Sequence, residues 1–448
     1  MSYSSDSEPD PELLELLRQH LHGKSSVPAA AETGVLEGAE FVYNHAIDVA
    51  LDMRGCKKAA ETIWTQMQQR EYSPATWSTH ELHPKDKNEE TVKFIFAMDI
   101  LNFSFWSERN EEERFQIEYR NKRWTGYWSL VAALQRGLEE GWFVPSSLLV
   151  MLLVLVFFCW LMVKCLVMWS YHSSVNNNNK EPFIDHPLPS AGIPITDPAF
   201  WIDEENFTVD VLRNVFRSAT DEEIPLLQER FDCLREAGQV LHEVCFPFRC
   251  PCDHMHSLTS PQKYDGSILT LIDSAHGSAA ALVNLLASDF PCFADIHPYP
   301  SPGPGRSVSS KPIRILKRAQ IFVADLWACF EGQSYGSFGD IDKITMFADY
   351  RVPQMLWQLN CLLYGPTLET AVREKRMIEQ GSEWEMQLRA CSIWCVELIR
   401  REIVRQHPDA AQKVNAVLID FFLYDAVKEL EREGGERIPH HRTRSIWY

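Results

Sequence analysis

Along most of the chain, apolar side chains recur every three or four residues, the spacing that gathers them on one face of an α-helix. Helices are predicted over residues 10–23, 34–70 with a break near Gly55, 90–101 (as helix or strand), 129–140, 207–242, 273–287, 313–332, 384–406 and 414–433, and in the second half of 340–365, with Pro353 in its first turn. The pattern therefore predicts a mainly α-helical fold class.

Strand signals are confined to a small N-terminal patch. Residues 99–106, DILNFSFW, are crowded with aromatic and β-branched side chains and predict a half-buried strand or a tight core segment. Residues 115–128 alternate apolar and polar positions around a polar turn, which predicts a hairpin. Proline, glycine and serine dominate residues 298–312 and predict a loop. His80 lies in another predicted loop, WSTHELHP.

One segment departs from this amphipathic pattern. Residues 148–163 are sixteen uninterrupted apolar residues, about the length of a transmembrane helix. The flanks lack a strong asymmetry of lysine and arginine, and the rest of the chain has the pattern of a soluble protein. Two interpretations remain open, a membrane span and a segment inserted into a soluble unit.

Composition narrows the classes of function. The 448 residues are 45% apolar and 23% charged, which is ordinary globular composition. A net charge of −19 argues against non-specific nucleic-acid binding, which needs a basic face. Residues 1–35 begin as a polar, acidic, disordered start followed by a short helix. No signal peptide precedes them, so we expect a reducing, cytoplasmic compartment in which the twelve cysteines form no disulfide framework.

Motifs for metals and cofactors are absent or poorly matched. Residues 245–256, CFPFRCPCDHMH, hold three cysteines and two histidines, but their spacing matches none of the usual two-plus-two zinc patterns. We interpret the stretch as an irregular surface insertion and expect no metal. The chain has no glycine-rich phosphate loop, no GxSxG and no HExxH, and we expect no cofactor.

Two aspartates stand out because they lie inside apolar runs. Asp325 lies in IFVADLW and Asp349 in ITMFADYRVP, where an ionised carboxylate without partners would cost several kcal/mol to bury. Lys317, Arg318 and Arg351 are the nearby cations. Such carboxylates either belong to structural ion pairs or are held ready for chemistry.

Taken together, several blocks of the chain resemble the queuosine salvage family, whose members hydrolyse queuosine 5′-phosphate to free queuine. The blocks are DILNFSFW (99–106), YRNKRWTGYWSLVAAL (119–134), EEG (139–141), IPIT (193–196), FRSATDEEIPLLQERF (216–231), KRAQIFVADLW (317–327), ITMFADYRVPQ (344–354), RACSIWCVELI (389–399) and RIPHHRTRSIWY (437–448). They keep their order, and with the WSTHELHP stretch they span most of the chain.

The resemblance implies a single, mostly α-helical domain, similar in layout to helical DNA glycosylases. In the family EEG runs almost directly into IPIT, so residues 36–141 and 193–448 would form the catalytic domain. Residues 142–192, which hold the apolar run, would then be an insertion. We interpret this insertion as a translated intron or a lineage-specific addition, and residues 246–264 as a second excess.

The family's catalytic aspartate corresponds to Asp349 in MFADYR. Its substrate-binding positions correspond to His80, Phe347, Asp420, Phe421 and Asp425. The family commonly has tyrosine where this chain has Phe421, so stacking survives there but a phenolic hydrogen bond does not. At about 100° per residue, the last three positions fall within about 140° of one helix face.

The implied reaction explains why such residues are needed. Cleavage of an N-glycoside builds positive charge on the ribose, and a carboxylate beside the anomeric carbon stabilises it. Asp349 would do this directly, attack covalently or activate water. Queuine is a 7-deazaguanine without an N7 to protonate, which places more of the work on the sugar. The candidate cations for the 5′-phosphate are Lys317, Arg318, Arg351 and Arg389.

The expected partner is therefore a small nucleotide. We expect the protein to be a monomer that binds no nucleic acid, and to associate with a membrane only if the apolar run is a genuine span. Two other functions stay open. The apolar run would suit a membrane-tethered helical adaptor without catalysis. The expected fold would suit a DNA-repair glycosylase, although the acidic charge opposes that function.

Overall fold

The computed structural model describes residues 31–140, 192–243, 263–302 and 308–448. Its α-helices are α2 (Val35–His45), α3 (Met53–Gln69), α4 (Glu89–Ile100), α5 (Tyr127–Glu139), α7 (Pro198–Trp201), α8 (Val209–Val215), α9 (Leu227–His242), α10 (Ile268–Asp273), α11 (Ala279–Asp289), α12 (Lys317–Cys329), α13 (Arg351–Gln358), α14 (Pro366–Arg373), α15 (Glu383–Gln406) and α16 (Ala416–Arg432). The mainly α-helical fold class is confirmed.

Short 3₁₀ helices and three strand pairs complete the described residues. The 3₁₀ helices are η1 (Pro74–Thr79), η2 (Pro291–Phe293), η3 (Ser334–Gly336), η4 (Ile341–Lys343) and η5 (Pro408–Gln412). The antiparallel pairs are β1 (Val49–Leu51) with β6 (Leu362–Tyr364), β2 (Ile117–Tyr119) with β3 (Lys122–Trp124), and β4 (Ile296–Pro302) with β5 (Val308–Arg314).

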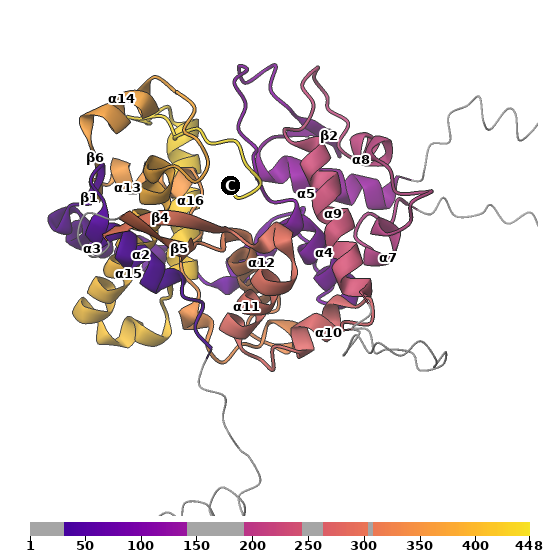
Figure 1. Cartoon of the computed structure of the whole chain (residues 1–448), viewed down its shortest axis with the longest axis horizontal. Helices are drawn as coiled ribbons and strands as arrows, with labels where there is room; N and C mark the ends of the chain where they lie inside the picture. The colour runs from indigo at the N-terminus through magenta and orange to yellow at the C-terminus, as the bar shows by residue number, and fades with distance from the viewer. Residues whose placement is uncertain (1–30, 141–191, 244–262, 303–307) are drawn as a thin grey trace, which may run out of the picture.

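The helices gather into two groups with α12 between them (Figure 1). One group holds α2, α3 and α13 to α16, and the other holds α4, α5 and α7 to α9. The chain reaches its C-terminus between the groups, where Tyr448 is buried and its carbonyl accepts a hydrogen bond from the Ser104 amide. The two groups are therefore joined by the central helix and by the C-terminal segment.

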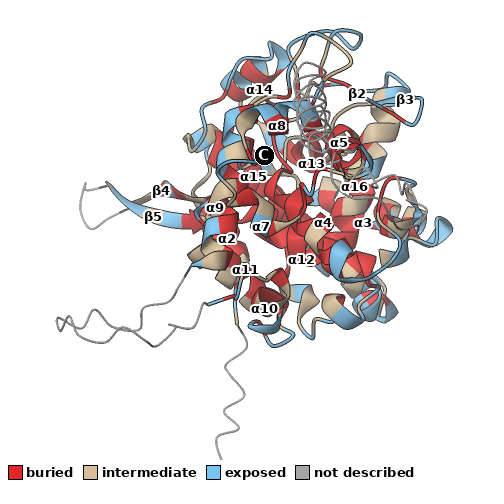
Figure 2. Ribbon diagram, turned by 90° about the vertical axis from the view of Figure 1, so that its right-hand side faces the viewer, coloured by how far each residue is buried: buried red, intermediate tan, exposed pale blue. Residues whose placement is uncertain are grey.

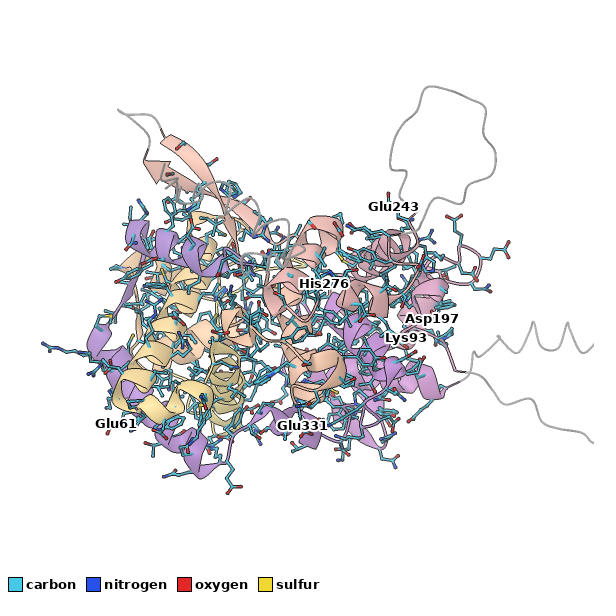
Figure 3. The ribbon with its side chains drawn as sticks, turned by 90° about the horizontal axis from the view of Figure 1, so that it is seen from below. Glu61, Lys93, Asp197, Glu243, His276 and Glu331 are labelled. Carbon is cyan, nitrogen blue, oxygen red and sulfur yellow. The ribbon has the colours of Figure 1, made fainter. Side chains whose placement is uncertain are left out.

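Helix α12 is buried on nearly every side, although it carries Lys317, Arg318, Gln320 and Asp325 among its apolar residues. Among its residues only Trp327 is not buried. It packs against α4, α11 and η1, and the buried residues concentrate in this central region (Figure 2). Charged side chains such as Glu61 and Glu331 lie at the outer edge of the molecule (Figure 3). Lys317 and Asp325 are carried by α12 and are therefore unusual in being ionisable and central.

The predicted helix break near Gly55 is wrong, because the break lies at residues 46–52 and contains β1. Asp52 caps α3, its side chain accepting a hydrogen bond from the Arg54 amide. Gly55 instead lies inside α3 and faces the carbonyl of Asn360, and a Cβ added there would meet that oxygen at 1.9 Å. The glycine is needed for close packing of two backbones and does not interrupt the helix.

The prediction that residues 298–312 form a loop, and that strands are confined to the N-terminal part, is also wrong. Strands β4 and β5 form a hairpin there, with Pro298 opposite Pro312. Proline cannot donate to a ladder but is tolerated on edge strands, and a two-stranded ribbon consists only of edges. The prolines are therefore compatible with these strands, although the composition of the segment indicated a loop.

Several helix boundaries differ from the prediction because backbone turns interrupt the apolar period. The predicted helix over 207–242 is two helices, α8 and α9, and the second begins after Leu226 in the left-handed conformation. The predicted helix over 273–287 begins only at α11, where Ser278 caps it. The predicted hairpin over 115–128 is confirmed by β2 and β3, and residues 101–106 form an irregular core segment.

Some predictions fall on residues that the structure does not describe. These are the short helix over residues 10–23, the apolar run over 148–163 and the cysteine–histidine stretch over 245–256. None of the helices in the described residues has both the length and the apolarity needed to cross a bilayer.

Gly55→Ala should lower the free energy of unfolding by about 1–3 kcal/mol, because the new methyl group overlaps the Asn360 carbonyl and one backbone must move. Gly137→Ala in α5 is the matched control, since a Cβ there meets only side chains at 3.4 Å or more. Denaturant unfolding measures both. The close-packing account is wrong if Gly55→Ala stabilises the protein as much as alanine ordinarily stabilises a helix.

Candidate active site

Asp349 lies immediately before α13 and caps its first turn. Its Oδ1 accepts hydrogen bonds from the backbone amides of Arg351, at 2.9 Å, and Val352, at 2.8 Å. A helix N-terminus favours a negative charge, so this arrangement stabilises the ionised carboxylate. The residue is partly buried, and Oδ2 forms no hydrogen bond with any described residue. One oxygen is therefore fixed and the other is free to act on a ligand.

Lys317, at the start of α12, supplies a positive charge near Asp349. Burial raises the pKa of Asp349, and the Lys317 ammonium and the two backbone amides oppose that rise. Lys317 is only 5% exposed, and its Nζ forms no hydrogen bond with a described residue. Burial lowers the pKa of Lys317 to about 8. The pair therefore places one carboxylate and one uncommitted ammonium in the same buried region.

Asp420, from α16, is the second carboxyl group of the site. Its Oδ1 accepts a hydrogen bond of 2.9 Å from the backbone amide of Phe347, two residues before Asp349. Burial, followed by the charge of Asp349, raises the pKa of Asp420 well above its usual range. Two neighbouring carboxyl groups resist being ionised together, and only Asp349 accepts two backbone amides. Asp420 is therefore the one that keeps its proton.

The other predicted residues of α16 lie beside this pair. The rings of Phe347 and Phe421 are 6.1 Å apart between centroids and tilted by 51°, so they form an aromatic surface. Asp425 is exposed and accepts a hydrogen bond of 2.6 Å from the Tyr72 hydroxyl. Burial, followed by the proximity of Asp425 and Asp420, raises the pKa of Tyr72, so this residue lies close to both aspartates. No local pattern in the sequence indicated Tyr72.

His80 belongs to an aromatic wall between η1 and the start of α5. Its ring stacks on Trp128 at 3.3 Å between centroids, and its Nδ1 accepts from the Leu82 amide at 3.2 Å. Next to it, His83 stacks on Trp77 at 3.7 Å. Burial lowers the pKa of both histidines, so both favour the neutral form.

Asp325 connects this aromatic wall to the acidic cluster, and Asp99 is its partner. Trp77 hydrogen-bonds Asp325, and burial raises the pKa of Asp325 to about 8. Burial, and then the charge of Asp325, raises the pKa of Asp99, whose Oδ2 is buried without a partner among the described residues. Asp325 thus belongs to no salt bridge among the described residues and instead lies among protonated carboxyl groups near Asp420. The sequence did not single out Asp99.

Three of the four candidate phosphate cations are committed to other groups. Arg318 is buried and donates to two backbone carbonyl groups. Arg351 pairs with Glu431 at 2.7 Å, and Arg389 pairs with Asp295 at 2.6 Å. These contacts disfavour all three arginines as ligands of a phosphate and leave Lys317 as the candidate.

The Asp295–Arg389 ion pair holds together the two segments that carry Lys317 and Asp349. Asp295 Oδ2 accepts a hydrogen bond of 3.2 Å from the Lys317 backbone amide at the start of α12. Arg389 Nε donates one of 3.0 Å to the carbonyl of Ala348, the residue before Asp349. The paired side chains are 2% and 0% exposed. Two buried charges in direct contact therefore fix Lys317 relative to Asp349.

The candidate site is identified by its buried ionisable side chains and not by a cavity. A cavity of about 540 Å³ lies beside Arg109 and Asp221, and one of about 250 Å³ lies beside Glu37 and Arg400. Neither is lined by a residue of the Asp349 cluster. We place the site at Asp349 because perturbed carboxyl groups next to an uncommitted lysine are typical of catalysis.

Asp295→Asn should lower the free energy of unfolding by about 3 kcal/mol, because it removes the closer of the two carboxylates that pair with the buried Arg389 guanidinium and leaves Glu385 at 3.3 Å. Asp409→Asn, in a pair with Lys413 that is mostly exposed, should leave stability nearly unchanged. Denaturant unfolding of both variants measures the difference. Equal, small losses would contradict the role assigned to the buried pair.

Comparison with known proteins gives a consistent result. The family model described as "Queuosine salvage protein" matches residues 82–151 and 183–448, and the unmatched residues 152–182 include most of the apolar run. A protein of Schizosaccharomyces pombe named "Queuosine 5′-phosphate N-glycosylase/hydrolase" is 37% identical over 92% of this chain and 99% of its own length. Proteins with the same name from Nematostella vectensis and Bos taurus are each 32% identical over 92% of this chain, covering 97% and 98% of their own lengths. The chain therefore belongs to the queuosine salvage protein family.

Proposed function

We propose that this protein hydrolyses the N-glycosidic bond of queuosine 5′-phosphate and releases queuine. The observation that carries the proposal is the Asp349 carboxylate, which is anchored through Oδ1 to two backbone amides while Oδ2 is uncommitted among described residues. Family membership and the names of the relatives support the same substrate and reaction. No nucleic acid takes part, and the enzyme acts as a cytoplasmic monomer with the layout of a helical glycosylase.

Asp349 acts on the sugar. As the bond from the base to the anomeric carbon lengthens, the ribose takes on oxocarbenium character. The free Oδ2 stabilises that charge, either directly or by forming a bond to the anomeric carbon that water then hydrolyses. The backbone amides keep Oδ1 in place throughout, so little reorganisation is needed as the charge develops.

Asp420 and the two phenylalanine rings act on the base. The rings of Phe347 and Phe421 provide a surface for the flat 7-deazaguanine. The Asp420 carboxyl, kept protonated by burial and by Asp349, donates a hydrogen bond toward the departing base. The exposed Asp425 suits the role of an anionic acceptor for the cationic amine of queuine better than the protonated Asp420 does. His80 closes the aromatic side of the site.

Lys317 binds the 5′-phosphate, because it is the candidate cation whose ammonium is not already paired. The negative phosphate would lie beside the buried Lys317 ammonium and so offset part of the free-energy cost of burying that charge. Neither alternative function has comparable support. A membrane-tethered adaptor needs no cluster of perturbed carboxyl groups, and a DNA glycosylase needs a basic face that a chain of net charge −19 does not suggest.

Asp349→Asn should reduce kcat for queuine release by about 10²–10⁴-fold or more, because asparagine still accepts the two amide hydrogen bonds but carries no charge. Asp342→Asn, an exposed aspartate in the same stretch, is the matched control and should retain full activity. Free queuine is measured by chromatography with purified protein and queuosine 5′-phosphate. A well-folded Asp349→Asn variant with normal turnover would overturn the proposal.

Lys317→Met should raise KM for queuosine 5′-phosphate while changing KM for the nucleoside queuosine little, because only the nucleotide carries the phosphate. The pKa of about 8 adds a pH signature. Above it the ammonium loses its proton, so KM for the nucleotide should rise in the natural protein. Lys317→Arg keeps its charge and should remove that rise. Equal losses on nucleotide and nucleoside would assign Lys317 to the chemistry at the sugar instead.

A further inference from the structure

Three buried cysteines, far apart in the sequence, meet away from the acidic cluster. Cys56 lies in α3, Cys361 precedes β6, and Cys395 lies in α15. Their sulfur atoms all lie within 4.8 Å of one another, and the Sγ atoms of Cys56 and Cys395 are 3.6 Å apart. Each residue is no more than 2% exposed. All three are free thiols, so the spacing does not come from a disulfide.

We propose that these three thiols bind a thiophilic d¹⁰ metal ion, with Zn²⁺ the favoured ion. Thiolate sulfurs that share one Zn²⁺ each lie about 2.3 Å from it, which places them about 3.8–4.0 Å apart. The observed cluster needs only small side-chain shifts to reach that geometry. A dication offsets more of the charge of three buried thiolates than Cu⁺ would, which is why Zn²⁺ is favoured.

The backbone around the cluster is built to hold the thiols together. Gly55 allows α3 to approach the Asn360 carbonyl, and the Asp52 amide donates a hydrogen bond of 2.9 Å to the carbonyl of Cys361. Strands β1 and β6 pair directly beside this contact. The elements that carry Cys56 and Cys361 are thus locked to each other before α15 adds Cys395.

The position of Cys56 also suits a thiolate. It lies in the first turn of α3, where the helix N-terminus favours negative charge and a bound cation would offset the repulsion from the capping Asp52 carboxylate. Met53, three residues earlier and the first residue of the same helix, is 45% exposed, so the surface is close to the cluster along α3. An ion reaching the thiols displaces their protons to water and forms up to three metal–sulfur bonds.

The ion would be structural and separate from the proposed catalysis. Cys395 lies six residues along α15 from Arg389, about 9 Å further along the helix axis. Binding would tie α3, the turn before β6 and α15 together on one side of the molecule. Without an ion, the three cysteines would fill the core as small apolar side chains.

The test measures zinc in the full-length protein, purified and desalted after expression with zinc, against three variants. Cys56→Ala should remove about one zinc per chain. Cys391→Ala, in the same helix but outside the cluster, should remove none. The doubly substituted Cys250→Ser/Cys252→Ser protein accounts for zinc bound by the cysteine–histidine stretch over 245–256, which lies outside the described residues. Cadmium substitution adds an ultraviolet sulfur-to-metal charge-transfer band, which Cys56→Ala should weaken.

A measurement on the natural protein guards against a variant that fails to fold. Buried thiols react with a labelling reagent only when the core opens locally, so residues 56, 361 and 395 should be labelled more slowly with zinc bound than after treatment with a strong chelator, as located by mass spectrometry. The proposal is overturned if the natural protein binds no zinc, or if the zinc content is the same in Cys56→Ala as in the natural protein. It is equally overturned if chelation changes labelling only within residues 245–256.

Discussion

The geometry of the site depends on one buried ion pair, Asp295 with Arg389. Each partner makes a second contact that fixes a piece of backbone: Asp295 holds the first amide of α12, and Arg389 holds the carbonyl before Asp349. Gln320 adds a parallel link, because its side chain accepts from the Thr345 amide at 2.9 Å. Lys317 and Asp349 come from segments about thirty residues apart in the chain. These contacts let the two segments act as one rigid frame.

The two carboxyl groups of the site, Asp349 and Asp420, differ in their protonation. Asp349 and Asp420 share a buried region but differ in their hydrogen-bond donors, two backbone amides for the first and one for the second. Because both cannot easily be ionised at once, the better-solvated Asp349 takes the charge and Asp420 keeps the proton. One fold can thereby offer an anion to the sugar and a hydrogen-bond donor to the base at the same pH.

The sequence predicted the helices well where the apolar period was long and undisturbed, as in α15 and α16. The predictions were wrong where a residue is required by a contact with a segment distant in the sequence. Gly55 suggested a helix break but serves a backbone contact with Asn360, and the prolines of β4 and β5 suggested a loop but lie in a two-stranded ribbon. Neither reason can be known before the partner segment is placed.

The residues of the candidate site also divide into those that the sequence indicated and those that only the tertiary structure shows. Asp325 and Asp349 were recognisable from the sequence because carboxylates within apolar runs are rare. Asp99 and Tyr72 were not, because nothing in their local pattern says which carboxyl group they will meet. The four candidate cations looked alike in the sequence, and only their tertiary partners separate Lys317 from the three arginines.

The most direct test of the central claim is a crystal structure of the Asp349→Asn variant with queuosine 5′-phosphate bound. The account predicts the anomeric carbon of the ribose in contact with the side chain at position 349, the base against Phe347 and Phe421, and the phosphate at Lys317. A nucleotide bound with its anomeric carbon remote from position 349, or seated in the cavity beside Arg109, would contradict it.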